Sequence, residues 1–175
     1  MANYIKISTP VGEMFLASDG TALCGAYFVG EKRTPLPDRL GRGQKSELLE
    51  QAAHELERYF AGELREFTVP LRPVGTPFQE RVWAGIAAIP YGRLSSYGKL
   101  AANLTTGARA IGSATGRNPI NIFIPCHRVV GYAGAITGYG GGLGKKRALL
   151  AMEGVIVKGN ACFEAQDLGR TLPPL

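Results

Sequence analysis

The chain has 175 residues, of which 45% are hydrophobic and 19% are charged, and it carries a formal net charge of +6. This balance is typical of a globular protein and excludes a disordered chain. No apolar run approaches the roughly 18 residues of a membrane-spanning helix, so we expect no membrane partner. The first residues lack a basic stretch followed by an apolar one, and three cysteines are too few for a disulfide framework. We therefore expect a cytoplasmic protein.

The positive charge is concentrated in one part of the chain. Residues 81–152 contain nine Lys or Arg and no Asp or Glu, whereas the remaining residues contain 11 basic and 14 acidic side chains. A long segment with positive charge alone is typical of a protein that binds a polyanion such as nucleic acid. The alternative is a basic surface that only maintains solubility.

The first elements along the chain are predicted strands. Residues 4–8 alternate between polar and apolar side chains, and residues 14–18 and 23–29 flank the turn signal Asp19-Gly20. These patterns predict antiparallel strands. Residues 30–45 are charged and rich in Pro and Gly, which predicts a loop.

A helix is predicted over residues 46–61, because apolar side chains recur there at helical spacing and Gly62 follows. Residues 63–75 predict a short strand or linker. We place a domain boundary here, and expect an N-terminal α/β domain over residues 1–74, a second domain over 75–157 and a tail over 158–175.

The second half opens on a helix signal. Thr76, Pro77 and Gln79 form the pattern of a capping box, and apolar side chains then follow at helical spacing up to Pro90. Two more helices are predicted over residues 97–103 and 108–116 with a Gly-containing turn between them, which is a helix-turn-helix pattern. The second of these helices is built from small residues, which suits either close approach to a partner or tight packing in a core.

The segment that follows holds the main candidate for chemistry. A short apolar run over residues 120–124 leads to Pro125-Cys126-His127-Arg128. A thiolate is the nucleophilic form of cysteine, a nearby cation such as Arg128 lowers the pKa of a thiol, and a histidine can act as its base. A Cys-His pair alone is a weak signal, and an inert buried cysteine is the alternative.

The other cysteines and histidine carry no predicted chemistry. Cys24 lies in an apolar strand and is interpreted as core, Cys162 is given no role, and His54 is expected to be solvated. Their spacing does not fit a zinc site. Residues 131–144 hold seven glycines, which predicts either a loop whose backbone recognises a flat base or a flexible hairpin.

A last helix is predicted over residues 145–153, with Gly154 after it. Its basic N-terminus (Lys145, Lys146 and Arg147) and its acidic C-terminus (Glu153) both oppose the helix dipole. Charges in locally unfavourable places indicate another role. The three basic residues are candidates for phosphate contact, and Glu153 is a candidate to orient a histidine.

Pro125-Cys126-His127-Arg128-Val129 resembles the active-site signature of the O6-alkylguanine-DNA alkyltransferases, the methylated-DNA–protein-cysteine methyltransferases. The resemblance extends from residue 76 to about residue 155, whereas the N-terminal half matches only in size and coarse pattern. Further matching segments are SYGKLA at 96–101, ARAIG at 108–112, RNP at 117–119, GYGGG at 138–142 and LLAMEG at 149–154.

The resemblance implies an N-terminal α/β domain of ribonuclease-H-like topology with an antiparallel sheet, and a mostly helical C-terminal domain with a winged-helix-like helix-turn-helix. It implies that the second helix binds the minor groove of double-stranded DNA and that the alkylated guanine is flipped into a pocket. The DNA-binding residues that it implies are Tyr97, Ala108, Arg109, Ala110, Gly112, Ser113 and Asn118. The pocket residues that it implies are Asn118, Val129, Tyr139 and Gly140.

The resemblance also assigns roles to single residues. Arg109 would fill the space that the flipped base leaves, Tyr97 would help rotate the nucleotide and donate a proton to the leaving guanine, and Asn118 would tie the recognition helix to the active site. Cys126, His127, Glu153 and Tyr97 are the implied catalytic residues. Glu153 orients His127, which deprotonates Cys126 through a water.

The implied activity is direct-reversal DNA repair, in which Cys126 takes the alkyl group and the protein acts once, without a cofactor or a metal. We expect a monomer; cooperative binding to DNA and activity on O4-alkylthymine stay open. The alternative function is a non-catalytic protein that binds alkylated bases and recruits other repair factors, against which the presence of Cys126 argues. A cysteine protease or hydrolase is a weaker third reading, because nothing indicates an oxyanion hole.

Overall fold

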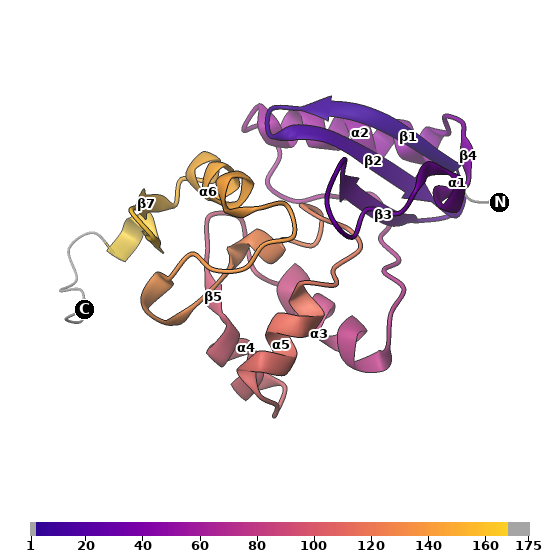
Figure 1. Cartoon of the computed structure of the whole chain (residues 1–175). Coiled ribbons are helices and arrows are strands. Elements are labelled where there is room, and N and C mark those ends of the chain that lie inside the picture. The colour runs from indigo at the N-terminus through magenta and orange to yellow at the C-terminus, as the bar shows by residue number, and fades with distance from the viewer. Residues whose placement is uncertain (1–2, 168–175) are drawn as a thin grey trace.

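A four-stranded sheet opens the chain in this computed structural model, which describes residues 3–167 (Figure 1). Its order is β3-β2-β1-β4. The strands β1 (Asn3–Thr9), β2 (Gly12–Ser18) and β3 (Leu23–Phe28) are antiparallel, as the alternation of side chains predicts, and the short β4 (Arg42–Gly43) runs parallel to β1. The inward side chains of β2 and β3 form the centre of the N-terminal core.

The segment predicted as a plain loop contains two short elements. Helix α1 (Pro37–Leu40) begins at Pro37, whose ring fixes a helical φ, and β4 pairs with the start of β1. The prediction of a structureless loop was therefore wrong for these residues. Their pairing depends on the backbone of β1, which the composition of the segment does not reveal.

Helix α2 (Glu47–Phe60) covers one face of the sheet (Figure 1). Ser46 caps it by accepting a hydrogen bond from the Leu49 backbone N–H, and Gly62 follows it with a positive φ of 77°. One stripe of α2, which includes Leu49, Leu56 and Tyr59, is buried against the sheet and the second half of the chain. The predicted helix is confirmed.

Helix α3 (Pro77–Ala87) opens the second half with the predicted capping box of Thr76 and Gln79. It packs against α5 (Ala108–Thr115), and the indole N–H of Trp83 donates to the Ala114 carbonyl at 2.9 Å. Helix α4 (Tyr97–Asn103) precedes α5, and a four-residue connection joins them into the predicted helix-turn-helix.

The small residues of α5 lie on both the buried and the exposed face of the helix, so tight packing in a core is confirmed for the buried face and close approach to a partner stays a prediction for the exposed one. Ile111, Ala114 and Thr115 are buried against the rest of the domain, while Ala108 and Ser113 are exposed. The small residues therefore allow tight packing on the buried face and leave short side chains on the exposed face.

The apolar run before Cys126 forms a tight turn that joins the two halves of the chain. Ile120 pairs with Ala26 of β3 as a single parallel bridge, in which the Ala26 N–H donates to the Pro119 carbonyl and the Asn121 N–H donates to the Ala26 carbonyl. Ile122 has a φ of 73°, a strained value for a β-branched residue. The turn leads into the 3₁₀ helix η1 (Cys126–Arg128) and into β6 (Val129–Val130), which pairs in parallel with β5 (Ser95–Ser96).

The chain then passes through η2 (Tyr132–Gly134) and the glycine-rich loop into α6 (Leu143–Met152). Gly154 follows α6 with a φ of 81°, as its position after the predicted helix requires. Strands β7 (Ile156–Lys158) and β8 (Ala161–Phe163) form a hairpin, and η3 (Ala165–Asp167) ends the described residues. The expected domain boundary after residue 157 falls inside this hairpin. Within residues 3–167, no helix is long and apolar enough to cross a membrane.

Two of the cysteines lie in apolar surroundings. Cys24 is partly exposed and packs with Phe15 and Leu40 on the outer face of the sheet, so its interpretation as core holds in part. Cys162, in β8, is buried in a small cluster with Val130 and Leu150. The side chain of His54 is 69% exposed, as expected.

Candidate active site

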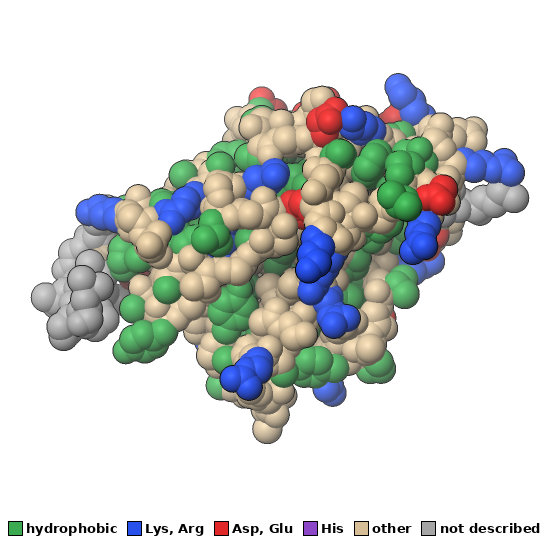
Figure 2. Space-filling model, viewed as in Figure 1, with side chains coloured by type: hydrophobic (Ala, Val, Ile, Leu, Met, Phe, Trp, Pro, Cys, Tyr) green, Lys and Arg blue, Asp and Glu red, His purple; other side chains and the backbone are tan. Residues whose placement is uncertain are grey.

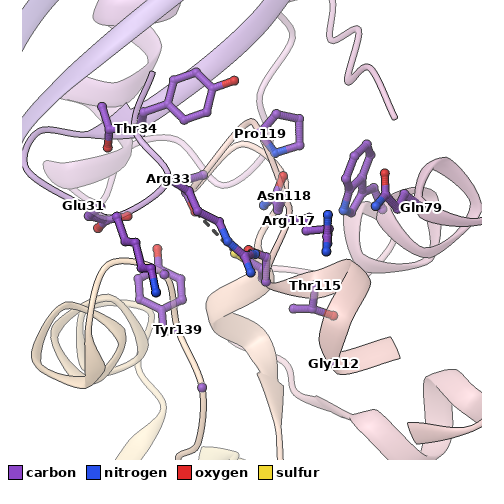
Figure 3. A pocket seen from close by; sticks show the side chains of 18 of the residues that line it. Glu31, Arg33, Thr34, Gln79, Gly112, Thr115, Arg117, Asn118, Pro119 and Tyr139 are labelled. Atoms are coloured by element: carbon purple, nitrogen blue, oxygen red, sulfur yellow. Dashed lines mark hydrogen bonds between the residues drawn. The ribbon is translucent and has the colours of Figure 1, made fainter. Parts of the chain in front are cut away.

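A cavity of about 720 Å³ lies between the two halves of the chain, with Cys126 among its lining residues. One wall is the loop over residues 31–35, the opposite wall is the C-terminal end of α5, and residues 138–140 close a third side. In Figure 3, Arg33 extends across this space toward the end of α5, where its guanidinium donates to the Gly116 carbonyl. The cavity is thus built from segments that are far apart in the sequence.

Cys126 lies at the buried end of this cavity, with 4% of its surface exposed. Its Sγ is 3.6 Å from Asn121 Oδ1. Burial raises the pKa of the Cys126 thiol to about 11, although the Asn118 side chain and the Lys146 charge act in the opposite direction. The resting side chain is therefore a thiol at neutral pH, and a base is needed to make it a nucleophile.

His127, the next residue, is the candidate for that base. It is fully buried, and burial lowers its pKa, so the ring is neutral at pH 7. Its Nε2 is 2.7 Å from Glu153 Oε1, which requires the proton to be on Nε2 because the carboxylate can only accept. Nδ1 is buried and has no hydrogen-bond partner among the described residues. This nitrogen is therefore free to accept a proton.

Glu153 is surrounded by donors. Beyond His127, its two oxygens accept from Arg128 Nε and Nη2, both at 2.9 Å, and from the Gly92 N–H at 3.2 Å. Burial alone raises the pKa of Glu153, but its hydrogen bonds with His127 and Arg128 and their charges outweigh burial and lower the pKa to about 2. The carboxylate is ionised throughout the physiological range, and the prediction that Glu153 orients a histidine has a direct geometric basis.

Two basic residues do not have the surroundings that the sequence predicts. Arg128 points away from Cys126: it pairs with Glu153, and its Nη1 donates to the Ile89 carbonyl at 2.5 Å. The cation near Cys126 is instead Lys146, which is buried and donates to the carbonyls of Val129 at 2.6 Å and Thr137 at 2.7 Å. The expected phosphate contact of Lys146 is therefore wrong, because α6 turns this side chain inward, where its ammonium is buried and bound to backbone carbonyls.

The remaining pocket candidates divide into two groups. Tyr97, Tyr139 and Gly140 line the cavity, and Tyr97 Oη donates to the Gly138 carbonyl at 3.4 Å. Val129 is absent from the lining, and its carbonyl accepts from Lys146. The hydroxyl of Tyr139 is buried without a partner among the described residues, which leaves a donor available in the cavity wall.

The DNA-binding candidates of α5 differ in exposure, and Ala110 is half-buried. Ala108, Arg109 and Ser113 are exposed, whereas Gly112 and Asn118 reach the cavity lining. On the face drawn in Figure 2, Lys and Arg side chains are spread over the whole molecule, whereas carboxylates are seen only over its upper part, toward the sheet, and not over the helical part below. This distribution agrees with the charge pattern of residues 81–152.

Asn118 connects the end of α5 to the turn before Cys126. Its Nδ2 donates to the Ile124 carbonyl at 2.8 Å, and its Oδ1 accepts from the Ile120 N–H at 3.0 Å. These bonds bracket Ile122, the residue with the strained φ. Asn118 therefore holds the turn that delivers Cys126 to the cavity.

Asn118→Ala is expected to lower the free energy of unfolding by about 3 kcal/mol, because two buried backbone groups lose their partners. Chemical denaturation measures this change. Asn103→Ala, at the exposed end of α4, is the matched control and should change stability little. Equal effects in the two variants would contradict the bridging role of Asn118.

Comparison with known proteins agrees with this geometry. Residues 3–73 match the family model described as 6-O-methylguanine DNA methyltransferase, ribonuclease-like domain, and residues 77–155 match its DNA binding domain. This chain belongs to the 6-O-methylguanine DNA methyltransferase family.

Relatives in this family match nearly the whole chain. The methylated-DNA–protein-cysteine methyltransferase of Mycobacterium bovis is 44% identical over 155 residues, which cover 87% of this chain and 93% of that protein. That of Methanosarcina acetivorans is 43% identical over 86% of this chain and 97% of that protein. The crystal structure of Mycobacterium tuberculosis O6-methylguanine methyltransferase has a TM-score of 0.78 at 44% identity, and covers 87% of this chain and 93% of that one. The structure of M. tuberculosis OGT in complex with DNA has a TM-score of 0.79 at 43% identity, over 86% and 92%.

The family's two-part fold, a sheet-based N-terminal half and a helical C-terminal half, is the one that the sequence predicts. The cavity, however, also uses residues that the sequence analysis missed. Glu31 lies in its wall, and burial raises the pKa of this carboxyl to about 7. Arg33 and Tyr59 contact the site from the N-terminal half. Within residues 3–167, no group of three or more His, Cys, Asp or Glu side chains is arranged to hold a metal ion.

Proposed function

We propose that this protein repairs DNA by moving an alkyl group from O6 of guanine to Cys126 in one step. The relatives are named methylated-DNA–protein-cysteine methyltransferases, and the chain covers more than 90% of the M. bovis protein. The observation that carries the proposal is the arrangement around Cys126: its thiol lines the cavity, and the neighbouring His127 keeps Nδ1 free while Nε2 is held by Glu153.

The reaction is a direct displacement at the alkyl carbon. The Cys126 proton passes to His127 Nδ1, through a water between them, and the thiolate forms a bond to the carbon as the carbon–O6 bond breaks. The electron pair of that bond leaves with the guanine. Guanine is a poor leaving group as an anion, and protonation makes it a better one. Tyr97 Oη, in the cavity lining, is the proposed proton donor. The product is a thioether, which water does not cleave, so each molecule acts once.

DNA binding fits the exposed face of α5. The O6 substituent is inaccessible inside a base stack, so the guanine must be turned out into the cavity. The proposal places α5 in the minor groove, with its small residues (Ala108, Ala110, Gly112 and Ser113) against the backbone and Arg109 in the space that the base leaves. The exposed Arg109 makes no hydrogen bond or salt bridge within the described part of the chain, which supports this role. Tyr139, Gly140 and Asn118 would then contact the flipped base.

Incubation with duplex DNA that contains O6-methylguanine, followed by intact mass measurement, tests the proposal. We expect a gain of one methyl group per protein, located on Cys126 by peptide mapping, and no second turnover with excess DNA. Cys126→Ser should abolish the gain. Cys24→Ser and Cys162→Ser are matched controls and should react normally, because neither thiol lines the cavity.

Continued turnover, or a methyl group on another cysteine, would refute the proposal. Binding to alkylated DNA without any gain in mass would support the alternative of a non-catalytic lesion-binding protein. Nothing in the site favours that alternative, since Cys126 and its base are in place.

A further inference from the structure

Tyr59, near the C-terminal end of α2, reaches the catalytic group from the other half of the chain. Its side chain is fully buried, and its hydroxyl donates to Glu153 Oε1 at 2.6 Å. Tyr59 and Glu153 are 94 residues apart in the sequence. The sheet-based half thus contributes a hydrogen bond to the carboxylate that orients His127.

Tyr59 binds the same oxygen of Glu153 that binds His127. Oε1 accepts from Tyr59 Oη at 2.6 Å, from His127 Nε2 at 2.7 Å and from Arg128 Nη2 at 2.9 Å. Arg128 binds both oxygens of Glu153, and so does not by itself favour the bond to His127. Tyr59 adds its bond to Oε1 alone.

The Tyr59 hydroxyl is held firmly and remains a donor. The ring lies 5.3 Å from the rings of Phe60 and Phe67 and 6.0 Å from that of Tyr91, measured between centroids. Burial, together with the nearby Glu153 carboxylate, raises the pKa of Tyr59 far above its usual value. A fixed ring leaves the hydroxyl little freedom to leave Oε1.

We propose that Tyr59 is a positioning residue for alkyl transfer: its hydroxyl fixes Glu153 Oε1 against Nε2 of His127, and so the N-terminal half of the chain sets the reactivity of Cys126. This inference rests on the proposed function. It assigns a role in the chemistry to a half of the chain that holds neither the nucleophile nor its base.

The test is Tyr59→Phe, which removes the hydroxyl and keeps the ring. The transfer rate is measured as a function of pH with free O6-benzylguanine, which needs no DNA. We expect a rate about tenfold lower, the usual scale for losing a group that orients a histidine, and a pH–rate inflection at higher pH because His127 becomes a poorer base. This variant leaves the other charged or titratable groups near Cys126 and Glu153 unchanged. These groups are Glu31, Tyr91, Tyr97, Arg128, Tyr139 and Lys146.

Tyr91→Phe is the matched control. Its ring belongs to the same aromatic cluster, but its hydroxyl donates to the Met152 carbonyl at 3.2 Å and not to Glu153. We expect a wild-type rate and inflection. Because the chain has only two histidines and His54 is exposed, nitrogen spectra of labelled histidine report His127 directly. Tyr59→Phe should change the His127 signals and leave those of His54 in place.

A double-mutant cycle with Glu153→Gln separates positioning from a general structural effect. If Tyr59 acts through Glu153, the double variant should be no slower than Glu153→Gln alone. The proposal would be overturned by additive losses in the cycle or by an unshifted pH–rate profile in Tyr59→Phe. A wild-type rate in Tyr59→Phe, or failure of that variant to fold, would overturn it as well. Failure of the proposed function looks different, because the wild-type protein would then gain no benzyl group at Cys126.

Discussion

Glu153→Gln is expected to slow alkyl transfer to Cys126 by about 100-fold, because an amide cannot hold His127 and Arg128 as the carboxylate does. The variant should also lose about 3–4 kcal/mol of stability, since Arg128 becomes a buried cation without a counter-charge. For a chain of this size, that loss corresponds to a melting temperature about 10 °C lower. Intact mass against time and thermal melts at neutral pH measure the two effects.

The stability effect has a defined pH dependence. The pKa of Glu153 is about 2 in the folded protein and about 4.5 for a free glutamate, so the folded state favours the ionised form. Its contribution, on the order of 3 kcal/mol, is fully present above pH 4.5 and is lost as the pH falls toward 2. Melting temperature should therefore fall more steeply over this window in the wild type than in Glu153→Gln.

Glu57→Gln is the matched control for this experiment. Glu57 lies on α2 with an 80% exposed side chain, and its removal should change neither the transfer rate nor the acid part of the stability curve. If Glu153→Gln reacts at the wild-type rate, the relay from Glu153 to Cys126 plays no part in the chemistry. If its stability shows the wild-type response to acid, the carboxylate is not the group that titrates.

Arg109→Ala is expected to reduce repair of O6-methylguanine in duplex DNA by roughly 100-fold, which corresponds to the few kcal/mol needed to unstack a base. The same variant should react with free O6-benzylguanine at nearly the wild-type rate, because a free base needs no flipping. Arg109 is exposed on α5 and distant from the buried relay, so its loss leaves Cys126 and His127 unchanged. The ratio of the two rates is the measured quantity.

Arg81→Ala removes the same charge from the exposed side of α3 and serves as the control. It should lower the duplex rate only slightly, through the general loss of positive charge, and so change the ratio far less than Arg109→Ala does. Equal losses on both substrates in Arg109→Ala would mean that this residue supports the fold or the cavity and has no special role with the flipped base.

Local sequence patterns predicted the elements that depend on neighbouring residues. The capping box of Thr76, the helix over Tyr97–Asn103 and the end of α6 at Gly154 all rest on spacing within a few residues. Glu153 was predicted to orient a histidine for a similarly local reason. A carboxylate at the C-terminal end of a helix is unfavourable next to the helix dipole, which indicated that Glu153 has another partner. The motif around Cys126 indicated the proposed nucleophile.

The parts that were missed depend on contacts between distant segments. No local pattern shows that Tyr59 meets Glu153, or that Arg33 reaches the carbonyl of Gly116. Lys146 was expected to contact phosphate, but the carbonyl of Val129 in β6 and those of Thr137 and Gly138 in the glycine-rich loop bind it instead. Such placements follow from how the halves pack, which a single sequence does not reveal.

The bridge between Ala26 and Ile120 limits how this protein can be divided. A fragment that starts near residue 75 would retain the thiol and its histidine, but it would expose Ile120 and leave the Asn121 N–H and the Pro119 carbonyl without their partners on β3. We therefore expect such a fragment to aggregate when it is produced alone. When the two halves are produced together, the backbone groups of this bridge can pair again. The protein could therefore serve as a split reporter, in which Cys126 becomes reactive only when the two halves reassemble.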